Sequence, residues 1–129
     1  MDETTVQEFS DFRFDIGPHR EGLSAMAAIG LDKASMRAAL IARNVVLFEA
    51  SGTRFFVDVT NDPETERDLQ LKKDCTYFVM LKNAESPEAA QSIRADIARY
   101  FLRHFPGRCL PQMRQASADG NFVYLACFS

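Results

Sequence analysis

The sequence has no long apolar run and no N-terminal targeting pattern. Its longest apolar stretch, near Tyr77–Leu81, is far shorter than the ~20 residues that a membrane-spanning helix needs. The first twelve residues, MDETTVQEFSDF, are acidic and polar, which argues against a signal or transit peptide. We therefore expect a cytoplasmic protein that does not bind membranes.

Cysteine and histidine are also scarce. Only Cys75, Cys109 and Cys127 are present, and they are widely spaced with no C-x-x-C. An odd number of scattered cysteines predicts free thiols in a reducing compartment rather than a disulfide framework. With two histidines, they form no zinc-ligand spacing, and phosphate-, dinucleotide- and metal-binding motifs are absent from the sequence. The sequence predicts neither a cofactor nor a metal site.

Basic charge is not in excess. The net charge of −3 argues against nucleic acid as the partner, because phosphate binding relies on clustered positive charge. The charge is uneven, since residues 86–129 hold five arginines and three acidic residues, and are the net-positive part of the chain. This asymmetry suggests a dipolar molecule with one surface that faces a partner.

Apolar residues, in contrast, are plentiful. The chain has 129 residues, 47% of them hydrophobic, with eleven phenylalanines. This length suits one domain over residues 1–129, with a core that needs no metal or disulfide.

Two segments have helical patterns, residues 20–43 and residues 86–105. Gly30 and Asp32 divide the first into two helices, with Asp32 as the N-cap of the second. Ser86-Pro87-Glu88 is a helix-start pattern for the other. The small residues of Ser24–Gly30 allow close packing within the chain or between two copies, so a homodimer is among the expected assemblies.

Strand patterns fill most of the remaining chain. The predicted strands are Phe9–Ile16, Asn44–Ala50, Thr53–Thr60, Cys75–Lys82, Gln112–Ala118 and Asn121–Ser129. Cys75–Lys82 is apolar on both faces, as a central strand should be, and so is FVYLACF within Asn121–Ser129. The sequence leaves residues 65–74 open between a short exposed helix and an edge strand. It predicts an α+β domain: a mainly antiparallel sheet of five or six strands, with helices 20–43 and 86–105 on one face. A parallel pair around helix 86–105 also remains open.

Residues 100–109, YFLRHFPGRC, concentrate reactive side chains. A helical wheel for residues 88–105 turns His104 inward, between Ile93 and Ile97, and turns Arg103 toward solvent. His104 and Arg103 should therefore not converge on one substrate atom. Cys109 and Arg114 are separated by four residues, one fewer than the Cys-x5-Arg loop of cysteine phosphatases requires. The sequence predicts no catalytic residue.

The leading functional hypothesis is a non-catalytic intracellular module that binds another protein through a rigid surface. Inhibitor, immunity, antitoxin and chaperone-like roles all fit this hypothesis. Its candidate partner-binding residues are Arg99, Arg103 and Arg108, because they lie in the net-positive half of the chain.

Two alternatives remain open. One is an enzyme or small-ligand protein whose site is assembled from Tyr77, Arg94, Tyr100 and His104. The other is a weak nucleic-acid binder that stacks bases on aromatic residues of its sheet.

Overall fold

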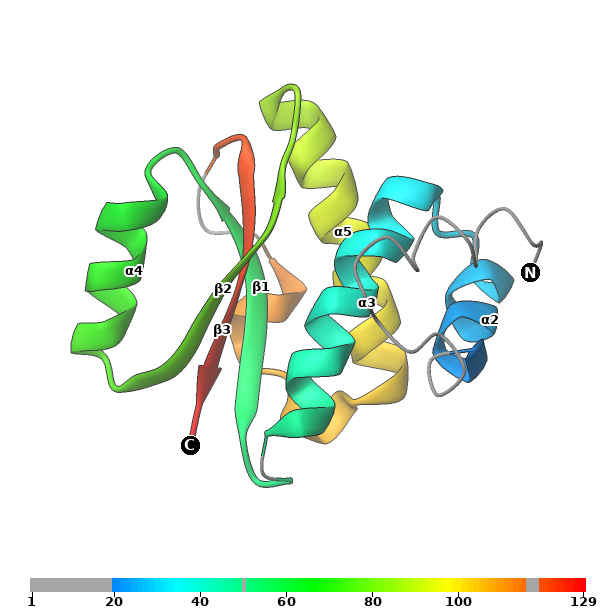
Figure 1. Cartoon of the computed structure of the whole chain (residues 1–129), viewed down its shortest axis with the longest axis horizontal. Coiled ribbons are helices and arrows are strands. Elements are labelled where there is room, and N and C mark those ends of the chain that lie inside the picture. Colours follow the sequence, from blue (N-terminus) through cyan, green and yellow to red (C-terminus); the bar gives the residue numbers. More distant parts are fainter. Residues whose placement is uncertain (1–19, 50, 116–118) are drawn as a thin grey trace.

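In the computed structural model, residues 20–49, 51–115 and 119–129 are described. Figure 1 shows their elements in chain order: α2 (Arg20–Ala28), α3 (Lys33–Phe48), β1 (Arg54–Thr60), α4 (Pro63–Lys72), β2 (Cys75–Asn83), α5 (Pro87–His104), the 3-10 turns η2 (Pro106–Arg108) and η3 (Pro111–Arg114), and β3 (Phe122–Phe128).

Capping side chains begin three of the helices. Asp32 accepts a hydrogen bond from the Ser35 amide at 2.9 Å at the start of α3. The Ser86 hydroxyl accepts one from the Ala89 amide at 3.1 Å at the start of α5. Asp62 caps α4, where hydrogen bonds from the Thr65 side chain and backbone hold the pKa of the Asp62 carboxyl below its usual value. The predicted break before Asp32 and the predicted start at Ser86 are confirmed.

The three strands form one antiparallel sheet in the order β1-β3-β2. The last strand in the chain is central: Leu125 pairs with Val57 of β1 on one side and with Val79 of β2 on the other. β3 is buried along its interior, which fits its position between two neighbours. β2 and β3, the strands on either side of α5 in the sequence, are antiparallel and not parallel.

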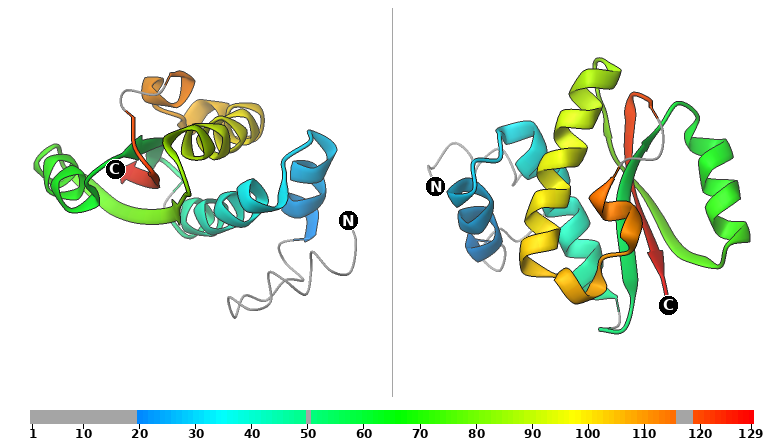
Figure 2. Two further views of the ribbon diagram at one scale, coloured as in Figure 1. Left: turned by 90° about the horizontal axis from the view of Figure 1, so that it is seen from above. Right: turned by 180° about the vertical axis from the view of Figure 1, so that it is seen from behind.

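Helices cover both faces of the sheet. Figure 2 shows α3 and α5 on one side of the strands and α4 on the other, and α3 and α5 also pack against each other. Phe101 of α5 is fully buried, with its ring centroid 5.1 Å from that of Phe55 on β1. α3 and α5 thus share one side of the sheet and an α+β unit results, while α2, the first part of the predicted helical segment 20–43, packs against α3.

The prediction of five or six strands is wrong, because the described residues contain three. Residues 44–48 of the predicted strand Asn44–Ala50 continue α3, since Ala39, Ala42 and Val46 are buried at helical spacing. Within Gln112–Ala118, residues 112–114 belong to η3, which buries Met113. The predicted strand Phe9–Ile16 lies outside the described residues.

The two edges of the sheet differ. The β1 edge is covered, because the Leu110 amide donates to the Phe55 carbonyl at 2.8 Å and Arg94 Nε donates to the Val57 carbonyl at 3.1 Å. β2 forms the opposite edge and, among the described residues, pairs with a strand on one side only. The sequence predicted Cys75–Lys82 as a central strand. This prediction is wrong, because β2 lies at the edge of the sheet and β3 is the central strand.

Candidate functional site

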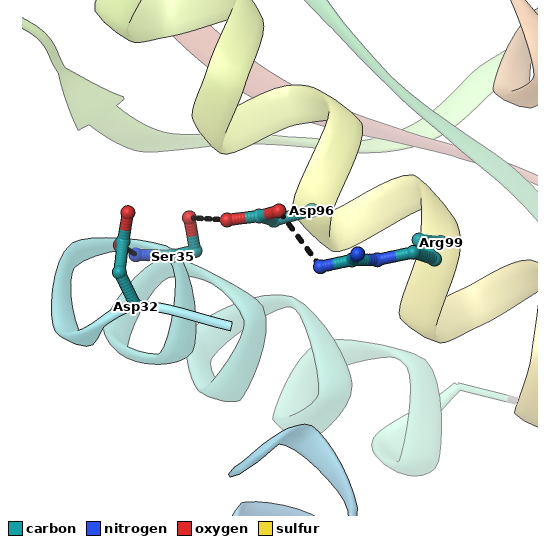
Figure 3. A network of polar contacts seen from close by, with 4 residues as sticks. All are labelled: Asp32, Ser35, Asp96 and Arg99. Carbon is teal, nitrogen blue, oxygen red and sulfur yellow. Dashed lines mark hydrogen bonds and ion pairs between the residues drawn. The ribbon is translucent and has the colours of Figure 1, made fainter. Parts of the chain in front are cut away.

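The candidate partner-binding arginines of α5 have different surroundings. Arg99 forms an ion pair with Asp96 at 3.0 Å, and its side chain is half exposed. Asp96 also accepts a hydrogen bond at 2.6 Å from Ser35, a fully buried serine on α3 (Figure 3). Arg103 is exposed. Arg99 therefore extends a polar link between α3 and α5, whereas Arg103 faces solvent.

Arg108 packs against the protein rather than projecting from it. Its Nε donates to the Thr53 carbonyl at 2.8 Å and its Nη2 to the Val46 carbonyl at 3.2 Å. The guanidinium carbon lies 5.8 Å from the centroid of the Phe55 ring. These contacts join η2 to the end of α3 and to the residue before β1, so Arg108 holds these three segments together.

The four residues of the ligand-binding alternative fall in three places. Arg94 is 6% exposed and binds three backbone carbonyls, those of Val57, Gln112 and Met113. Tyr77 is on β2, 48% exposed. Tyr100 and His104 do lie together, with ring centroids 4.7 Å apart. The structure thus brings Tyr100 and His104 together and separates them from the other two.

His104 does not occupy the inward position that the helical wheel predicted. It is exposed, and Tyr100 is buried in its place at 2% exposure. The Tyr100 hydroxyl accepts a hydrogen bond from Arg43 Nε at 3.1 Å. Arg43 Nη1 is buried without a hydrogen-bond partner in the part of the chain that the structure describes. The buried side of α5 is therefore rotated toward Tyr100 relative to the prediction.

Cys109, the cysteine of the stretch 100–109, is not an activated nucleophile. All three cysteines are free, and Cys75 and Cys127 are buried. Burial raises the pKa of Cys109 to about 11, although Arg114 and Arg108 oppose this shift. A thiol with so high a pKa is protonated at neutral pH and is a poor nucleophile. No group of three potential metal-binding side chains is found among the described residues.

Two adjoining grooves lie where α3, the end of β2 and the start of α5 meet. One has a volume of about 300 Å³ and is lined by Asp32, Lys82, Glu85 and Ser92, among others. The other, of about 350 Å³, shares Ala34 and Lys82 with it and includes Arg37. Both acidic and basic side chains line the pair of grooves, so their charge does not select an anionic or a cationic ligand.

The most distinctive surface surrounds β2. Large hydrophobic side chains that are exposed occur, among the described residues, only on α3, α4 and β2: Leu47, Phe48, Leu69, Leu71, Tyr77 and Met80. Both helices contact β2. In the left-hand view of Figure 2, β2 runs in light green along the outside of the sheet from α4 to α3. Of these exposed side chains, Tyr77 and Met80 lie on the open edge strand itself.

β2 exposes apolar side chains on both faces of the sheet. Tyr77 pairs with Cys127, which pairs with Phe55, so Tyr77 is on the α5 side. Met80 pairs with Tyr124 and lines, with Phe78 and residues of α4, a groove of about 160 Å³. We name the outer edge of β2, with Tyr77 and Met80, the β2 edge.

The sequence analysis missed the β2 edge because it treated the strand as buried on both faces. A local signal does distinguish β2 from β3. Asp74 directly precedes β2 and Lys82 lies near its end, whereas the central strand FVYLACF contains no charged residue. Charged residues at the ends of a strand are typical of sheet edges.

Comparison with protein-family models, curated proteins and solved structures found no significant match to this chain. In addition, no helix in the described part of the chain has the length and apolarity required to cross a membrane.

Proposed function

We propose that this protein is a non-catalytic protein-binding module that binds its partner along the β2 edge. The observation that carries the proposal is the coincidence of an edge strand with exposed Tyr77 and Met80. Inhibitor, immunity, antitoxin and chaperone-like roles all fit this proposal, because each needs only a rigid surface that binds another protein. The exposed apolar residues are the part of such a surface that yields free energy when a partner covers them.

The backbone of β2 supplies the second element of recognition. An edge strand presents unpaired N–H and C=O groups, to which an incoming strand adds by main-chain hydrogen bonds. Side chains on either side of the strand then select the partner. Tyr77 is 48% exposed on one face and Met80 is 37% exposed on the other, so a bound strand is contacted from both faces.

Tyr77 is suited to this role because an exposed tyrosine buries a large area at a small entropic cost and retains a hydroxyl for hydrogen bonding. Met80 adds a flexible apolar side chain that adapts to different neighbours. Arg99 and Arg103 stay predictions for a separate contact on α5. Arg108 is not included in the proposal, because its guanidinium is engaged by the backbone.

The proposal is tested by affinity capture from the cells in which the protein is made. The bait variant carries Tyr77→Lys and Met80→Lys, since lysines on an edge strand oppose strand addition. Leu69→Lys is the control, because Leu69 is 47% exposed on α4, close to the 48% of Tyr77, and does not lie on the strand. We expect wild type and control to retain the same bound proteins and the double variant to lose them.

Equal recovery of bound proteins by the double variant and by wild type would contradict the proposal. Thermal melting of all three proteins accompanies the capture. The substituted side chains are exposed, so similar melting temperatures are expected.

A further inference from the structure

We infer that the β2 edge binds a second copy of this chain, with the two β2 strands antiparallel about a twofold axis at Phe78. The inference rests on the proposed function and names its partner. The dimer would contain one continuous six-stranded sheet, three strands from each copy. A twofold axis uses the same surface on both copies, so one self-complementary strand suffices.

Charge complementarity selects this partner and this register. Asp74 and Lys82 lie at equal separations from Phe78, one on each side. Antiparallel pairing centred on Phe78 therefore brings Asp74, in the turn just before β2, to the end of the other copy's β2 that carries Lys82. Both residues are exposed in the single chain, and neither has an ion pair among the described residues. Opposite charges brought together at the ends of the two paired strands favour association of this partner in this orientation.

The same register keeps like faces together. Directly opposed residues in an antiparallel pair point to the same face. With Phe78 on the axis, Tyr77 of one copy lies opposite Val79 of the other on the α5 side, and Phe78 lies opposite its own counterpart on the α4 side. Apolar side chains thus meet apolar side chains on both faces. A shift of one residue would bring Tyr77 opposite Phe78, which points to the other face.

Two further features limit the assembly. β2 has register shifts at Cys75/Tyr77 and at Met80/Lys82, which leave Tyr77–Met80 as its regular segment. A short paired segment predicts a reversible dimer rather than a permanent one. The other sheet edge is already covered by Leu110 and Arg94, so strand addition stops at two copies and does not continue into a filament.

The first test is the molar mass of the full chain in solution as a function of concentration. We expect wild type to change from monomer to dimer as concentration rises. The variant with Tyr77→Lys and Met80→Lys should remain monomeric, and Leu69→Lys should dimerise like wild type. Hydrogen exchange of the β2 amides should slow with concentration in wild type and not in the double variant.

The second test examines the register by charge reversal. Asp74→Lys alone, or Lys82→Asp alone, places like charges opposite each other at both ends of the paired strands and should weaken dimerisation. When the two variants are mixed, every charge in the mixed dimer meets its opposite, so dimerisation should recover. Asp74 has a positive φ of 67°, which disfavours lysine, but such local strain is not relieved by mixing.

Three results would overturn the inference. A monomer at every concentration would do so, including a monomer whose β2 amides are already protected by another part of the same chain. A dimer insensitive to the double variant would place the interface elsewhere, and failure of the mixed variants to recover would exclude this register. In the first case the proposed function survives if the double variant still loses its captured proteins, so the two failures are distinguishable.

Discussion

Arg94 on α5 donates from Nε to the carbonyl oxygen of Val57 on β1, at 3.1 Å. Its Nη2 donates at 2.8 Å to the Gln112 carbonyl and at 2.7 Å to the Met113 carbonyl. One buried guanidinium therefore joins the helix layer, a sheet edge and η3. Burial lowers the pKa of Arg94, and the nearby charge of Asp58 opposes this shift.

Replacing Arg94 should lower the free energy of unfolding more than replacing an exposed arginine does. Arg94→Met leaves buried carbonyls without a donor, which should lower the free energy of unfolding by about 3 kcal/mol. Arg94→Lys should not restore it, because an ammonium cannot reproduce the planar spread of donors. Chemical denaturation measures both variants, with Arg99→Met as the exposed control. A loss for Arg94→Met no larger than that for the control would refute this role.

Phe101 should be a major contributor to the core. Its side chain is fully buried against Phe55, so Phe101→Ala should lower the free energy of unfolding by about 3–5 kcal/mol. Arg103→Ala, two residues further along the same helix and exposed, should change it by less than about 0.5 kcal/mol. Urea titration of the two variants gives the comparison. Equal effects would mean that α5 presents a different side to the sheet.

Gly120 should not tolerate a side chain. A Cβ at this position would lie 2.0 Å from the carbonyl carbon of Thr60, where only backbone could move to relieve the clash. Gly120→Ala should therefore destabilise the protein by about 1–3 kcal/mol or more. Gly107 has open space around it, and Gly107→Ala should be neutral or slightly stabilising. The melting temperature should thus fall for Gly120→Ala and not for Gly107→Ala, and a tolerated Gly120→Ala would contradict the close approach.

The buried thiol of Cys127 should make stability fall in alkaline solution. Burial raises its pKa to about 12 from 9.0. Between these values the unfolded chain ionises this thiol while the folded chain keeps it protonated. The free energy of unfolding therefore decreases as pH rises from 9 toward 12, by up to about 1.4 kcal/mol per pH unit.

Comparison with Cys127→Ala isolates this effect, because other groups that titrate in the same range remain in both proteins. Denaturation at several alkaline pH values should show a shallower decline for the variant. Parallel declines would show that the thiol ionises equally readily in the folded and unfolded chains.

Short-range chemistry made several elements predictable. Asp32 and Ser86 begin helices because their side chains accept from amides three residues ahead, an interaction contained within one turn. The strand predictions over residues 53–60, 75–82 and 121–129 likewise overlap β1, β2 and β3. In contrast, the apolar run after Asn44 suits a strand or a buried helix face equally well. The packing of Val46 in the core, a long-range contact, made it helical.

The candidate site was less predictable for the same reason. Arg94 and Arg108 carry charges that suggest a surface role, yet backbone carbonyls distant in sequence hold both. The predicted orientation of His104 depended on which residues were taken as the centre of the buried face of α5. In the structure that centre lies nearer Tyr100, because of the segments that pack against α5. Each of these positions depends on which other segment packs against it.

The sequence by itself determined where α3 and α5 begin, which segments are apolar enough to be buried, and the α+β class, since these follow from caps and from periodicity between near neighbours. Only the tertiary structure decided the strand order β1-β3-β2. Both β2 and β3 are apolar strands, and the choice of which is central lies in hydrogen bonds between residues up to dozens of positions apart. Because the C-terminal strand takes the central place, β2 is at the edge, and Tyr77 and Met80 are exposed beside it.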